Sequence, residues 1–102
     1  MSAMHITKEN FEQEVILSDK PVLLDFWAPW CAPCRMVLPV VEEIAQERSD
    51  IKVCKINIDE QPDLASRFRI MTIPTLMVMQ GGEMVQKAVG ALPKEQILEL
   101  LG

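Results

Sequence analysis

Residues 21–34 read PVLLDFWAPWCAPC, and this stretch decides the fold. Its first half is a nearly continuous apolar run that begins at a proline, which is typical of a central strand covered on both faces. Asp25 is the one charged residue in that run. Two cysteines, Cys31 and Cys34, close the stretch and directly precede apolar residues at helical spacing. The stretch therefore predicts a buried strand that delivers two thiols to the start of a helix.

The helix predicted after the cysteines runs from about Cys31 to Arg48 and should be the longest in the chain. Apolar residues at helical intervals predict its buried side, and polar residues mark its solvent side. The apolar set is Met36, Val37, Val40, Val41, Ile44 and Ala45, and the polar set is Glu42, Glu43, Gln46 and Glu47. Pro39 falls inside the helix, where it removes a backbone donor, so we expect a kink there.

Outward from this unit, short strands alternate with helices. Towards the N-terminus we expect a strand at residues 4–6, then a helix that Thr7 caps and that runs to about Leu17, with Phe11, Val15 and Ile16 on its apolar side. Towards the C-terminus we expect strands at 51–58, 75–79 and 83–89, helices at 62–68 and 93–101, and a hairpin turn at Gly81 and Gly82. The order βαβαβαββα predicts an α/β fold, a three-layer sandwich with a central mixed sheet flanked by helices.

Length and composition indicate a single domain, residues 1–102. Because 49% of its 102 residues are hydrophobic, the chain can bury one core but has no room for a second domain. No apolar run approaches the ~20 residues of a membrane span, and the N-terminus lacks the basic and apolar segments of a secretory signal. We therefore expect a cytoplasmic protein without a membrane partner.

The charge pattern argues against a nucleic acid partner. The formal net charge is −5, and the basic residues are scattered singly instead of forming a patch that could follow phosphates. An acidic surplus also discourages self-association, so we expect a monomer.

Cys31 and Cys34 are predicted to form a reactive dithiol. A bridge across so short a loop restricts the unfolded chain little, so stapling the fold is a poor explanation for the pair. A thiol near the N-terminus of a helix favours its thiolate form, which is the nucleophile in disulfide exchange. Cys31 would therefore attack, and Cys34 would displace whatever Cys31 captures. Pro33 stiffens the residues between them and is tolerated in a first helical turn.

Zinc binding is the main alternative for this pair. A zinc site needs about four ligands, but the sequence offers no second CxxC motif, one histidine at His5 and one further cysteine at Cys54. Cys54 lies within a predicted strand and is interpreted as a small buried hydrophobe. We therefore expect no metal, and redox chemistry is the favoured interpretation.

The motifs together resemble the thioredoxin family. The resemblance is carried by DFWAPWCAPC at residues 25–34, Ile73-Pro74-Thr75 and Gly90, which have the family's order and spacing and extend over nearly the whole chain. Ala32 is a departure, because thioredoxins usually carry glycine at this position. The resemblance implies the thioredoxin fold and reduction of protein disulfides through a mixed-disulfide intermediate.

The resemblance also implies roles for further residues. Asp25 would be the buried carboxylate that takes or returns the proton of Cys34, and burial should raise its pKa towards neutral pH, where a general base is effective. Lys55 matches the family lysine that approaches this aspartate. Ile73 and Pro74 resemble the family's cis-proline loop, which offers backbone groups to an extended client segment. Trp30, Ala32, Pro33, Ile73, Pro74 and Gly90 would form the docking surface for clients.

By the same resemblance, the dithiol is the redox centre without any added cofactor, and a thioredoxin reductase supplies its electrons. Disulfide-containing proteins are the expected clients. Two alternatives stay open at this stage. The same chemistry could run in reverse, as an oxidase or isomerase, although the Ala-Pro dipeptide is closer to the Gly-Pro of reducing relatives. The docking surface could also serve a binding module without turnover.

Overall fold

The computed structural model describes residues 2–102 and contains every strand that the sequence predicts. In chain order the elements are β1 (Met4–His5), η1 (Glu12–Ile16), β2 (Val22–Trp27), α1 (Ala32–Glu47), β3 (Lys52–Asn57), α2 (Pro62–Arg67), β4 (Thr75–Gln80), β5 (Glu83–Val89) and α3 (Lys94–Leu100). Within the described residues, every helix is too short or too polar to cross a bilayer.

The five strands form one mixed sheet in the order β1-β3-β2-β4-β5. The strands β1, β3 and β2 run parallel, whereas β4 runs antiparallel to β2, and β5 antiparallel to β4. The hairpin between β4 and β5 turns at Gly81 and Gly82, both with positive φ, as the sequence predicts. The strand from residues 21–34 is therefore the middle strand, with neighbours on both sides.

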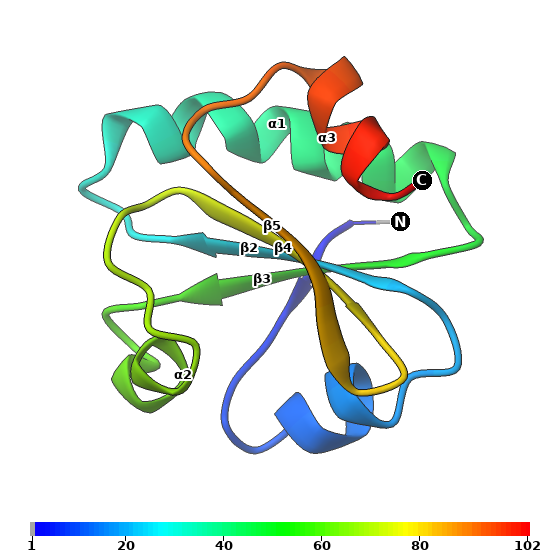
Figure 1. Ribbon diagram of the computed structural model, residues 1–102. Helices are drawn as coiled ribbons and strands as arrows, with labels where there is room; N and C mark the ends of the chain where they lie inside the picture. The colour runs from blue at the N-terminus through cyan, green and yellow to red at the C-terminus, as the bar shows by residue number, and fades with distance from the viewer. Residues whose placement is uncertain (1) are drawn as a thin grey trace.

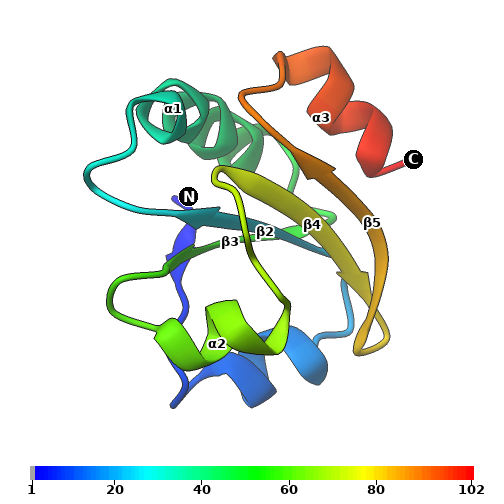
Figure 2. The same cartoon turned by 60° about the vertical axis from the view of Figure 1, so that its left-hand side comes forward.

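Helices cover both faces of the sheet, which makes the predicted three layers. Figure 1 shows α1 and α3 on one face and the first helical turn with α2 on the other, and the turned view in Figure 2 agrees. The side chains of β2 alternate between two cores: Leu23 packs with α1 and α3, and Leu24 and Phe26 pack with η1 and α2. Burial on both faces explains why the run reads as continuously apolar. The mixed sheet and its layers confirm the predicted fold class.

The helix expected from Thr7 to Leu17 is present in part, as a helical turn that begins near Thr7 and continues into η1. The side chain of Asn10 accepts a hydrogen bond from the Thr7 N–H and donates one to the His5 carbonyl, which holds residues 7–10 in a turn. The bond from the Thr7 N–H to the Asn10 side chain has the form of half a capping box, and the Phe11 N–H donates to the Thr7 carbonyl at 3.0 Å, so a helical turn begins here. Only η1 follows, a single π-helical turn in which the Leu17 N–H donates to the Glu12 carbonyl. Thr7 is therefore not a side-chain cap, although Phe11 and Val15 are buried as predicted.

The predicted long helix is confirmed as α1, with one misplaced side chain. Val37, Val41 and Ile44 are buried against the sheet, but Met36 is 71% exposed. Met36 precedes Val37 by one residue, about 100° around the helix, so it lies on the flank of the buried stripe. The helix continues across Pro39, which lies on its exposed side, and the kink there stays a prediction.

Candidate active site

The dithiol lies where β2 feeds α1, as the sequence predicts. Cys31 is the N-cap of α1 in an extended conformation, and its Sγ accepts a hydrogen bond from the Cys34 N–H at 3.2 Å. Cys31 and Cys34 are joined by a disulfide, with their Cα atoms 5.3 Å apart. Cys31 retains 5% exposure and Cys34 only 1%, so an incoming sulfur can reach Cys31 first.

The start of α1 supplies the electrostatics of the site. The N–H groups of a first helical turn have no intrahelical acceptor, and they stabilise negative charge placed beside them. One of them, on Cys34, already points at the Cys31 sulfur. Ala32 and Pro33 fill the first turn and are exposed, and Pro33 removes a donor that the helix does not need there. A Cys31 thiolate would therefore be favoured in the reduced protein.

Asp25 is fully buried on β2. Among residues 2–102, no hydrogen-bond donor reaches either of its carboxylate oxygens. Burial raises the pKa of Asp25 to about 7, and the positive charge of Lys55 opposes that rise. The carboxyl group therefore exchanges a proton near neutral pH, which is what a general acid or base requires.

Lys55 is the register partner of Asp25 on the neighbouring strand β3. Its ammonium group lies 4.0 Å from Glu42 on α1, and Glu42 also accepts a hydrogen bond from the Ala3 N–H at 2.8 Å. The helical pattern predicts Glu42 on the solvent side of α1, but its side chain is only 29% exposed and contacts Lys55 and Ala3. Glu42 and Glu43 are neighbours of the same type, so the helical pattern had no signal to separate them.

The segments around Pro74 and Gly90 meet beside the dithiol. The Ile73–Pro74 peptide bond is cis, and the Ile73 carbonyl oxygen lies 3.8 Å from the Cys31 sulfur. The Gly90 N–H donates to the Pro74 carbonyl at 2.9 Å, with Gly90 at a φ of +108°. The Ile73–Pro74 segment therefore lies beside the Cys31 sulfur, and Gly90 is joined to that segment by a backbone hydrogen bond.

Exposed apolar side chains flank this group. Trp30 is 67% exposed, and its indole N–H donates to the Asp59 carboxylate at 3.0 Å. Met71 and Val89, next to the other two segments in sequence, are also exposed. The sequence carries no signal for Asp59, because it lies in an acidic turn after β3 that is indistinguishable from an ordinary solvated loop. The surface offers apolar contact around a reactive sulfur.

Cys54 lies away from this chemistry. It is fully buried in the core on the η1 side of the sheet and makes no disulfide. Burial raises its pKa to about 12, so the thiol stays protonated and inert. Across residues 2–102, no cluster of three or more His, Cys, Asp or Glu side chains could hold a metal ion.

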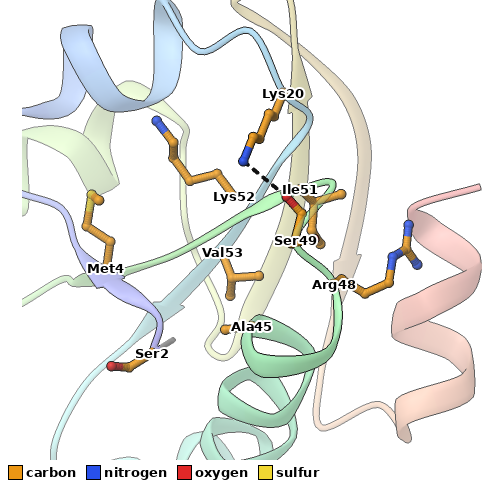
Figure 3. Close-up of a pocket in the computed structure, with 9 residues that line it drawn as sticks. All are labelled: Ser2, Met4, Lys20, Ala45, Arg48, Ser49, Ile51, Lys52 and Val53. Carbon is orange, nitrogen blue, oxygen red and sulfur yellow. Dashed lines mark hydrogen bonds between the residues drawn. The ribbon is translucent and has the colours of Figure 1, made fainter.

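A cavity of about 140 Å³ lies at the far end of α1. Figure 3 shows the nine residues that line it, contributed by the N-terminal segment, the loop before β2, the end of α1 and the chain that leads into β3. The dashed line in Figure 3 marks the hydrogen bond that the Lys20 ammonium group donates to the Ser49 carbonyl at 3.0 Å. Since α1 has 16 residues and is roughly 24 Å long, this cavity is separate from the dithiol.

Comparison with known proteins agrees with the geometry. The family model described as Thioredoxin matches residues 2–102. "Thioredoxin 1" of Nostoc sp. is 54% identical over 101 residues, which is 98% of this chain and 94% of the relative. "Thioredoxin" of Pyropia yezoensis is 53% identical over 102 residues, which is 99% of this chain and 95% of the relative. The chain belongs to the thioredoxin family and is a thiol-disulfide oxidoreductase of the protein-disulfide reductase type.

Proposed function

We propose that Cys31 is the attacking thiol of this reductase and Cys34 the resolving thiol. The Cys31 thiolate attacks one sulfur of a client disulfide, forms a mixed disulfide and releases the other client sulfur as a thiolate. Cys34 then loses its proton, attacks the Cys31 sulfur and releases the second client thiolate. The client gains two electrons and the protein keeps the Cys31–Cys34 disulfide. The observation that carries this order is the position of Cys31 at the helix N-terminus with the greater exposure of the two.

Asp25 is the acceptor for the Cys34 proton in this proposal. Its pKa of about 7 allows it to accept a proton near neutral pH and to return one when the disulfide is reduced again. Lys55, beside it in the sheet, modulates that basicity through its charge.

Clients dock as extended segments over Trp30, Ala32, Pro33, Ile73, Pro74 and Gly90. Main-chain hydrogen bonds disregard side-chain identity, so such docking suits a protein that serves many disulfide-containing clients. The closeness of the Ile73 carbonyl to the Cys31 sulfur supports this arrangement, because a client bound there would present its own sulfur to Cys31.

The same proposal extends to the setting in which the protein works. Residues 1–102 act as one domain and a monomer in the cytoplasm, with a thioredoxin reductase as electron donor and no cofactor beyond the dithiol. Both helical layers pack on one sheet, which supports a single domain, and the net charge of −5 favours a monomer.

Trapping tests the assignment of the two thiols. The Cys34→Ser variant should accumulate mixed disulfides with an oxidised client such as insulin, because nothing displaces the client from Cys31. The matched control, Cys31→Ser with Cys34→Ser, should trap none. Peptide mapping of the adducts identifies the linked cysteine. Adducts through Cys54, or equal trapping by the control, would overturn the assignment.

A further inference from the structure

Glu42 joins three elements at the inner side of α1. One of its carboxylate oxygens accepts the Ala3 N–H at 2.8 Å and lies 4.0 Å from the Lys55 ammonium group. The side chains of Glu42 and Lys55 are only 29% and 16% exposed, so water and salt screen their interaction less than they screen a surface pair. Glu42 is thus a carboxylate held by a backbone N–H within 4.0 Å of the Lys55 ammonium group.

Lys55 therefore interacts electrostatically with two carboxyl groups, those of Glu42 and Asp25. It is the register partner of Asp25 on β2, and its charge is what opposes the effect of burial on that carboxyl group. On β4 the register partner of Asp25 is Leu76, which carries no charge. On β1 the register partner of Lys55 is His5, whose side chain is exposed. From α1, which packs over this side of the sheet, Glu42 comes within 4.0 Å of the Lys55 ammonium group.

We propose that Glu42 is a positioning residue for the reaction: tethered by the Ala3 N–H, it holds the Lys55 ammonium group and so keeps Asp25 basic enough to accept the Cys34 proton. The inference rests on the proposed role of Asp25. A Lys55 side chain released from Glu42 would give its full charge to Asp25 and stabilise the carboxylate, which weakens it as a base.

Removing the charge of Glu42 without its shape tests the inference. Glu42→Gln keeps an oxygen for the Ala3 N–H but no longer attracts Lys55. In the oxidised protein, the titration midpoint of the Asp25 carboxyl carbon, followed by NMR, should fall by about half a pH unit. Glu43→Gln is the matched control: it removes the same charge at the next position of α1, where Glu43 pairs with Lys94 on the outer side, and it should leave the midpoint in place.

The same substitution made in a Lys55→Met variant distinguishes an effect of Glu42 on Asp25 that acts through Lys55 from a direct electrostatic effect of Glu42 on Asp25. In Lys55→Met, adding Glu42→Gln should move the Asp25 midpoint much less than it does in the wild type. An equal movement in both backgrounds, or no movement in the Glu42→Gln single variant, would overturn the inference.

The pH dependence of client reduction connects the titration to the chemistry. In Glu42→Gln, the acid limb of the pH–rate profile should move down together with the Asp25 midpoint. If the midpoint moves and the acid limb does not, Asp25 is not the proton acceptor, and the proposed function fails at that step. If neither moves, only the role of Glu42 is overturned.

Discussion

Asp25 and Lys55 are register partners on neighbouring parallel strands, yet the Asp25 carboxylate has no hydrogen-bond donor in the part of the chain described by the structure. The charge of Lys55 is thus the main opposition to the cost of burying Asp25, and burial prevails, which raises the pKa of Asp25 to about 7. Ionisation of the Asp25 carboxyl group therefore destabilises the folded protein.

The first prediction concerns stability. Because the pKa of Asp25 in the folded protein exceeds the ordinary 3.8, the native state retains a proton that the unfolded chain releases. The free energy of unfolding should therefore fall as pH rises from about 4 to about 7, by roughly 4 kcal/mol, and stay low above that. Asp25→Asn should lose this slope, so it should match the wild type near the acid end and be more stable at alkaline pH.

Denaturant unfolding of the oxidised proteins at a series of pH values measures this difference. Asp50→Asn is a suitable control: Asp50 is exposed, and its hydrogen bond with Arg48 lowers its pKa, so it does not titrate in the same window. A stability gain for Asp25→Asn that is equal at every pH would contradict the explanation by ionisation.

The second prediction concerns the rate of resolution. Without Asp25 to accept its proton, the Cys34 thiol should attack the mixed disulfide about 100-fold more slowly near neutral pH. Asp25→Asn should therefore slow single-turnover client reduction and abolish the acid limb near pH 7. The deficit should narrow at about pH 9, where hydroxide can ionise the thiol directly. A deficit that persists unchanged to alkaline pH would point to distorted geometry instead of a missing base.

The sequence was sufficient to predict the elements that carry the chemistry. The stretch at residues 21–34 combines apolar burial with a switch to helical spacing, and both signals are local, so β2, α1 and the place of the dithiol follow from them. The N-terminal helical segment was predicted in its place but not with its π-helical geometry, because the spacing of apolar residues does not distinguish a π-helical turn from an α-helical one.

The charged partners of the site could not be predicted in the same way. Glu42 contacts Lys55 and Ala3, which are 13 and 39 residues away in sequence, and Asp59 contacts Trp30 across 29 residues. Such contacts depend on the tertiary packing of α1 and of the loop after β3 against the sheet. Composition and periodicity describe each element separately, so they carry no information on these pairings.

The third prediction separates the cysteines by reactivity. In the reduced protein near neutral pH, iodoacetamide should modify Cys31 faster than an ordinary free cysteine, because the helix start favours its thiolate. Cys54, with its pKa raised to about 12 and its sulfur in the core, should stay unmodified until the protein unfolds. Peptide mass spectrometry over a time course measures both rates. Labelling of Cys54 in the folded protein at a rate comparable to Cys31 would contradict its assignment as inert.

The fourth prediction concerns Gly90. Its φ of +108° lies where L side chains are strained, although an added Cβ would meet no described atom within 4 Å. Gly90→Ala should therefore destabilise the fold by about 1–2 kcal/mol through backbone strain alone. Gly81→Asn, at a φ of +61° that asparagine tolerates, should cost less.

The activity of Gly90→Ala then tests the docking surface. The Gly90 N–H donates to the Pro74 carbonyl, so relaxation of the strain should displace the Ile73–Pro74 segment from Cys31. Reduction of insulin should fall several-fold through a higher KM, whereas reduction of a small aromatic disulfide, which needs no extended docking, should change little. If reduction of both substrates slowed equally, the substitution would act on the dithiol itself, and the proposed docking of extended clients beside Gly90 would be wrong.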